Sequence, residues 1–120
     1  FLIGLKLFSE IMADLPNGHP GCLIATYCYN ERLFDGEIMS ISKHTMLAWR
    51  HRFRAMFERI ADLYEMEDPV DLDHLADMVS NTAEGAIIMA KSLQDPQIVP
   101  QQILLLRSYL KLLFQRRKVQ

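Results

Sequence analysis

Hydrophobic residues recur along this chain at intervals of three and four positions, which is the period of an α-helix. In the first segment Phe1, Leu5, Phe8 and Met12 follow this spacing, and charged residues take the opposite side. No Asn-Gly pair joins two runs of alternating apolar residues, the pattern typical of a β-hairpin. The sequence therefore predicts an all-α fold without a sheet.

Proline and glycine fall in few places, and they divide the chain into helical segments. The breaks lie at 16–21, at Asp35-Gly36, at Asp68-Pro69 and between Asp95 and Pro100. The 120 residues are enough for one domain with its own core. We expect a single domain, 1–120, folded as an orthogonal or antiparallel five-helix bundle. The predicted helices span 1–14, 22–34, 37–66, 71–93 and 98–116.

Three features support the ends of these helices. Asp71 is a favourable N-cap for the fourth helix, and Asp73 places an acid in the first turn, where the helix dipole favours it. Pro100 suits the first turn of the fifth helix. The basic residues 116–118 suit the carboxyl end of that helix, which predicts that it continues to Arg116.

The third helix is long and amphipathic. Its basic cluster, Arg50-His51-Arg52-Phe53-Arg54, has two interpretations: a nucleic-acid patch or a solvated helix face. Acidic residues follow the cluster and Phe53 belongs to the apolar stripe, so we favour the solvated face. The apolar stripe consists of Ile38, Met46, Trp49, Phe53, Met56, Phe57, Ile60 and Tyr64, and the opposite side carries Lys43, Arg50, Arg54, Glu58 and Asp62.

Composition narrows the class of protein. Hydrophobic residues make up 50% and charged residues 23%, which is too apolar for a disordered segment. The net charge of −2 argues against bulk nucleic-acid binding. Two cysteines, Cys22 and Cys28, are too few for a disulfide framework, which favours a reducing cytoplasm. No apolar run approaches the roughly 20 residues that span a bilayer, so we expect no membrane association.

The last two predicted helices are apolar on more than one side, which a helix on a monomer surface does not need. Two antiparallel pairs related by a twofold axis would bury the second side in a four-helix bundle, which predicts a homodimer. The alternative is that a further piece of the same chain covers this surface. The candidate interface residues are Met78, Gly85, Ile88, Met89, Ile103, Leu106, Leu110 and Leu113.

Three segments, in this order and spacing, resemble the C-terminal effector domain of TetR-family transcriptional regulators. Gly21-Cys22-Leu23-Ile24-Ala25 resembles the opening of a central helix, and the stretch 75–90 resembles the penultimate helix. Asp95-Pro96 followed by 104–114 is similar to the final helix. The family's N-terminal helix-turn-helix has no counterpart in this sequence, and the chain begins at Phe1 rather than at Met. We expect a DNA-binding segment upstream.

The resemblance implies a division of labour. The last helices form the homodimer, and a cavity among the preceding helices binds a small apolar or aromatic effector molecule. Effector binding shifts the spacing of the absent DNA-binding heads, as in a repressor that releases its operator. DNA would be contacted only through the missing N-terminal domain.

Seven methionines and one tryptophan supply adaptable linings for such a cavity. The candidate ligand-binding residues lie on the first four predicted helices. The alternative for each of them is an ordinary core position, and the chain would then be a helical homodimeric interaction module with a packed core and no ligand cavity. The candidates are Phe8, Met12, Thr26, Tyr27, Asn30, Trp49, Phe53, Met56, Phe57 and Thr82.

The residues that catalysis requires do not form a recognisable set. The four histidines, His19, His44, His51 and His74, lack partners at metal-ligand spacing. There is no glycine-rich phosphate loop and no serine nucleophile elbow. We therefore expect no enzymatic activity, no catalytic residue, no metal and no cofactor.

Overall fold

The computed structural model describes residues 1–15, 18, 21–22 and 36–119. This part of the chain is mostly helical, as predicted, and holds four helices and two short strands. The predicted helix over 22–34 lies outside the described residues except for Cys22. The elements are α1 (Leu2–Asp14), α3 (Gly36–Leu63), β1 (Tyr64–Glu65), α4 (Leu72–Leu93), α5 (Ile98–Leu113) and β2 (Arg116–Arg117).

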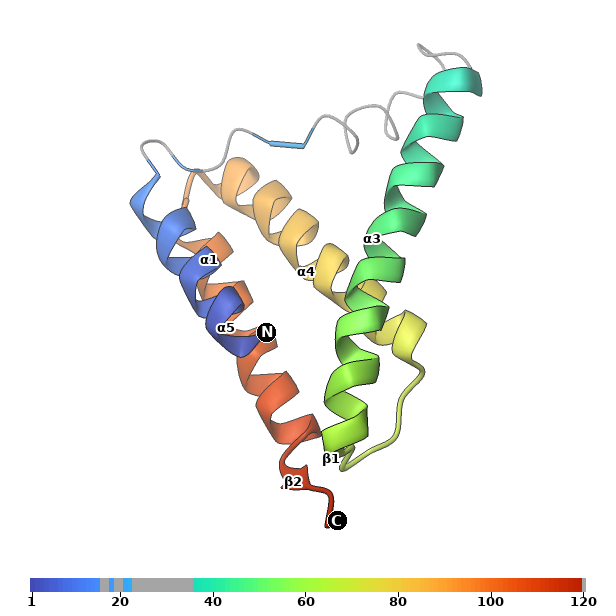
Figure 1. The fold of residues 1–120 in the computed structure, drawn as a ribbon. Helices are drawn as coiled ribbons and strands as arrows, with labels where there is room; N and C mark the ends of the chain where they lie inside the picture. Colours follow the sequence, from blue (N-terminus) through green and yellow to red (C-terminus); the bar gives the residue numbers. More distant parts are fainter. Residues whose placement is uncertain (16–17, 19–20, 23–35, 120) are drawn as a thin grey trace.

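The helices pack against one another in a thin assembly. α1 lies along α5, α5 turns back beside α4, and α4 crosses α3, as Figure 1 shows. The molecule measures 54 × 33 × 19 Å. The smallest extent is about two helix diameters, because a helix with its side chains is roughly 10 Å wide. Helices in so thin an arrangement keep an uncovered face.

The amino end of α4 has the predicted cap, and its carboxyl end has a cap that was not predicted from the sequence. The Asp71 carboxylate accepts hydrogen bonds from the backbone N–H groups of Asp73, at 2.7 Å, and of His74, at 3.2 Å. At the other end Gln94 adopts a left-handed conformation with φ of 52°, and its N–H donates to the last carbonyls of the helix. These bonds satisfy backbone groups that a helix end leaves open. Pro100 lies in the first turn of α5, also as predicted.

Two helix ends and the expected absence of a sheet were predicted wrongly. α3 ends at Leu63 and α5 at Leu113, three residues earlier than expected in each case. Beyond them β1 pairs with β2 in antiparallel register, with Tyr64 opposite Arg117. The pairing continues in backbone bonds from Lys118 N–H to the Leu63 carbonyl and from Glu67 N–H to the Leu113 carbonyl, both 2.8 Å. The Leu63 and Leu113 carbonyls thus accept hydrogen bonds from a distant segment of the chain, and neither helix continues beyond them.

Phe57 lies at the centre of the core. Its side chain is fully buried, with the Phe1 ring edge-to-face at 5.1 Å and the Phe114 ring stacked at 6.3 Å between centroids. Aromatic rings prefer these arrangements, and each buries a large apolar area. The remaining core residues are mainly aliphatic and come from α1, α4 and α5: Leu5, Met12, Leu75, Val79, Ala86, Ile87, Ala90, Val99, Ile103, Leu106, Leu110 and Leu113.

We expect Phe57→Ala to lower the free energy of unfolding by about 3–5 kcal/mol, because the substitution leaves a cavity where three rings meet. Met56→Ala is the matched control, since the Met56 side chain is 40% exposed and its loss should cost less than about 1 kcal/mol. Urea titration followed by circular dichroism measures both values. Equal losses in the two variants would contradict the assigned core.

The Asp71 cap should make α4 sensitive to acid. Hydrogen bonds from the backbone N–H groups of His74 and Asp73 hold the pKa of the Asp71 carboxyl below its usual range. A lowered pKa in the folded state means that the stabilisation is present above the unfolded pKa and is lost as pH falls through the folded pKa. The Asp71→Asn variant keeps a side-chain oxygen that can cap the helix, but it has no carboxyl group that takes up a proton. Urea midpoints from pH 7 down to pH 2 should therefore fall less in this variant, and parallel curves would contradict the role of the cap.

Candidate functional site

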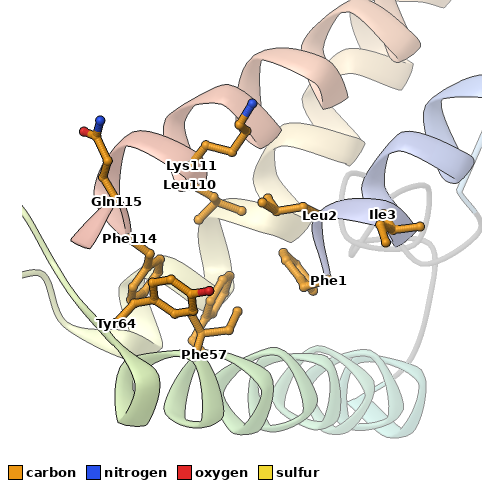
Figure 2. Close-up of a pocket in the computed structure, with 10 residues that line it drawn as sticks. Phe1, Leu2, Ile3, Phe57, Tyr64, Leu110, Lys111, Phe114 and Gln115 are labelled. Carbon is orange, nitrogen blue, oxygen red and sulfur yellow. The ribbon is translucent and has the colours of Figure 1, made fainter. Parts of the chain in front are cut away.

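A half-open cavity of about 580 Å³ lies where the ends of α1, α3 and α5 meet, and Figure 2 shows it. This volume is within the range of small-molecule sites, about 300–1,000 Å³. Three stretches of the chain that are far apart in sequence form its walls. They contribute Phe1, Leu2 and Ile3 from the start of the chain, Phe57, Ile60 and Tyr64 from α3 and β1, and Leu110, Lys111, Phe114 and Gln115 from the end of α5.

Local interactions hold these walls in place. The Phe1 carbonyl accepts the first helical bond, from Leu5 N–H at 3.0 Å, so the Phe1 ring projects from the very start of α1. The Arg107 guanidinium donates to the Leu2 carbonyl at 3.3 Å and links α1 to α5. Phe114 follows α5 directly, and its N–H donates to the Leu110 carbonyl at 3.0 Å. Two of the rings that line the cavity, Phe1 and Phe114, are therefore held at helix ends.

Polar side chains occupy only part of the cavity. In Figure 2 the Tyr64 ring lies beside Phe114 and Phe57, whereas the amine of Lys111 and the amide of Gln115 point away from these rings. None of the ten lining residues is acidic. The hydroxyl of Tyr64 is thus the polar group on the aromatic wall, and the Lys111 ammonium and the Gln115 amide are turned away from that wall.

Among the predicted ligand-binding residues that the structure describes, Phe57 alone lines this cavity. Phe53 is close by, with its ring edge-to-face to Phe1 at 6.4 Å between centroids. Met12 is buried in the core, and Trp49 and Thr82 are half-buried away from the cavity lining. The ligand-binding role of these residues stays a prediction.

Two predicted pocket residues do not face inward as expected. Phe8 and Met56 are 36% and 40% exposed, because the adjacent stripe on each helix makes the core contacts. Three further candidates, Thr26, Tyr27 and Asn30, lie outside the described residues.

The aromatic residues at the helix ends were the signal that the sequence offered for this cavity. Phe1, Tyr64 and Phe114 each stand next to a predicted or observed helix terminus. Periodicity assigns a side to residues inside a helix, but it does not show which helix ends meet. Lys111 and Gln115 carried no sequence signal at all, because basic and amide side chains near a helix end are ordinary surface residues.

A second feature is an apolar surface along α4 and α5, which we name the α4–α5 face. Met78, Gly85 and Met89 share one exposed stripe of α4, and Leu105, Tyr109 and Leu112 share one of α5. Each stripe has helical spacing. Met89 is 52% exposed, Leu105 62% and Leu112 63%. α5 contacts α4, and each of the two helices carries one such exposed apolar stripe.

The structure corrects half of the predicted dimer interface. Met78, Gly85, Ile88 and Met89 are exposed, as a partner-binding role requires. The four α5 candidates are between 1% and 4% exposed, because α1 and α4 already cover that side of α5. They belong to the core of this chain and are not available to a partner: Ile103, Leu106, Leu110 and Leu113.

The arginines of α3 were expected on a solvated face, but two of them contact α4. Arg50 forms a bidentate pair with Asp77, at 2.8 and 2.9 Å. Arg54 bonds Glu58 of its own helix at 2.8 Å and Asp73 of α4 at 3.0 Å. The hydrogen bonds that the Arg50 guanidinium donates to the Asp77 carboxylate raise the pKa of Arg50. These half-exposed pairs orient α3 on α4 and contribute little stability.

The described part of the chain offers no group of three or more histidine, cysteine, aspartate or glutamate side chains that could hold a metal ion. In the same part, none of the helices is long and apolar enough to cross a membrane.

Comparison with known proteins found no family model, no curated protein and no solved structure that matches this chain. The cavity, the α4–α5 face and the ion pairs are therefore interpreted from their own chemistry.

A double-mutant cycle tests the Arg50–Asp77 pair. Arg50→Ala and Asp77→Ala should destabilise the fold by less in combination than the sum of their single effects, because each removes the same interaction. The coupling should shrink as NaCl is raised, since salt screens exposed charges. The cycle of Arg52→Ala with Asp77→Ala is the control, because the Arg52 side chain is exposed on α3 and forms no pair with Asp77. Equal coupling in both cycles would refute the pair.

Proposed function

We propose that this chain is the effector-sensing and dimerisation domain of a TetR-like transcriptional regulator, a cytoplasmic repressor. The order of its helical segments resembles that family. The proposal assigns DNA contact to helix-turn-helix heads that have no counterpart in these 120 residues. Small-molecule binding changes the spacing of those heads.

The α4–α5 face is the observation that carries the proposal. Full burial of a leucine or methionine side chain stabilises by about 1.5–3 kcal/mol, and here several such side chains on α4 and α5 stay largely exposed. A second copy related by a twofold axis presents the same surface, and the two helix pairs would form a four-helix bundle. Gly85 is exposed and has no atom within 4 Å of an added Cβ position, so the two backbones can approach closely there.

The cavity supports the sensing part of the proposal and favours it over an interaction module with a packed core. Its walls come from α1, α3 and α5, so a ligand contacts three elements at once. A ligand shifts a conformational equilibrium only if it binds one arrangement more tightly than the other. A molecule held between three helix ends meets this condition, because any relative movement of the helices changes its contacts.

The first test is the mass in solution. The unmodified chain should show twice the monomer mass by light scattering at micromolar concentration. Met89→Asp combined with Leu105→Asp should raise the dimer dissociation constant at least about a hundredfold, because four carboxylates would be buried in the interface. Both residues are more than half exposed in the single chain, so its fold should persist, as circular dichroism can verify.

The control is Ile41→Asp, an equally exposed apolar residue on α3 and away from the α4–α5 face. It should leave the dimer intact. A monomeric unmodified chain, or a dimer that survives both substitutions on the α4–α5 face, would overturn the proposed assembly.

A further inference from the structure

The polar side chains of the cavity share one property: each can donate a hydrogen bond. Tyr64 offers a hydroxyl, Lys111 an ammonium and Gln115 an amide. Within the part of the chain that the structure describes, none of these three side chains has a hydrogen bond or ion pair to the protein. None of the described residues that line the cavity is acidic. Tyr64 and Gln115 can also accept a hydrogen bond, whereas the Lys111 ammonium can only donate one, so Lys111 is the group that favours an anionic acceptor.

We propose that the cavity binds an amphipathic monocarboxylate, with its apolar body against the apolar wall and its carboxylate at the mouth beside Lys111. An ionised carboxylate accepts hydrogen bonds and donates none, and its negative charge matches the Lys111 ammonium. This inference rests on the proposed function only in equating the ligand with the effector. The binding site itself does not depend on dimerisation, because none of its lining residues belongs to the α4–α5 face.

The apolar wall of the cavity determines which part of a ligand the cavity holds. Phe57 is fully buried against Phe1 and Phe114, so the wall that a ligand body meets consists of the lining residues that keep accessible apolar surface. These are Phe1, Leu2, Ile3, Ile60 and Tyr64. Burial of one further methylene group of the ligand strengthens binding about fourfold. Affinity should therefore rise with the length of the apolar body until the cavity is filled.

The charge at the mouth determines which end of the ligand stays outside. Lys111 is an exposed residue on α5, and Figure 2 shows its amine turned away from the rings. A carboxylate beside it keeps part of its hydration, so it avoids the large cost of burying an ion. A cationic ligand would meet the same ammonium with like charge. The pairing of a ligand carboxylate with Lys111 therefore contributes selectivity for anions, on the order of three- to tenfold. The apolar wall supplies most of the affinity.

The test uses octanoate, decanoate and 1-decanol, each titrated calorimetrically into the full 120-residue chain below the micellar concentration. We expect one decanoate per chain, bound about tenfold or more tightly than octanoate and about three- to tenfold more tightly than 1-decanol. Lys111→Gln, which keeps the length of the stem, should remove the preference for decanoate over 1-decanol and leave 1-decanol binding unchanged. Lys43→Gln, on exposed α3 surface, is the matched control.

A second variant locates the site independently of the charge. Ile3 lines the cavity and is 75% exposed, so Ile3→Asp should preserve the fold while it weakens decanoate and 1-decanol alike. Equal affinity for the acid and the alcohol, a preference that survives Lys111→Gln, or binding untouched by Ile3→Asp would each overturn the inference. Failure of the dimer in light scattering would instead refute the proposed function and leave the binding result standing.

Discussion

Phe57 and the two rings around it connect elements that are distant in the sequence. The ring of Phe57 touches Phe1 at the start of α1 and Phe114 at the end of α5, and it is fully buried between them. Because an aromatic contact of this kind is directional, it sets how α3 stands against α1 and α5. The same three rings line the cavity. Of the three rings, Phe1 keeps accessible surface whereas Phe57 is fully buried, so a molecule bound in the cavity would touch Phe1 and not Phe57.

The thinness of the molecule explains why so much apolar surface remains. At 19 Å in its smallest extent the assembly is about two helices deep, so each helix packs on one side only. On α5 the inner side holds Ile103, Leu106 and Leu110, and the outer side holds Leu105 and Leu112. A surface of this kind on both neighbouring helices is a feature that monomeric proteins seldom retain, and the proposed twofold pairing would cover it.

The contact between α3 and α4 is different in character. At its outer edge two arginines of α3 pair with Asp73 and Asp77 of α4, and these side chains remain accessible to water. Water and salt weaken such pairs, so they direct the crossing of the helices more than they stabilise it. When α3 moves relative to α4, these water-accessible ion pairs exchange partners. Such a movement exposes little of the core at that edge. The apolar junction around Phe57 offers far more resistance.

The sequence by itself determined the all-α class, the limits of α1 and α4, the Asp71 cap and the burial of Phe57, because these follow from interactions within one helix or from a single stripe. Only the tertiary structure decided which apolar side of α5 faces inward, which partners Arg50 takes, and that Tyr64 pairs with Arg117. It also placed the cavity at the helix ends, where Phe57 is the one described ligand-binding candidate among the lining residues. Periodicity reports on neighbours three and four residues apart, whereas these outcomes depend on contacts between segments up to a hundred residues apart.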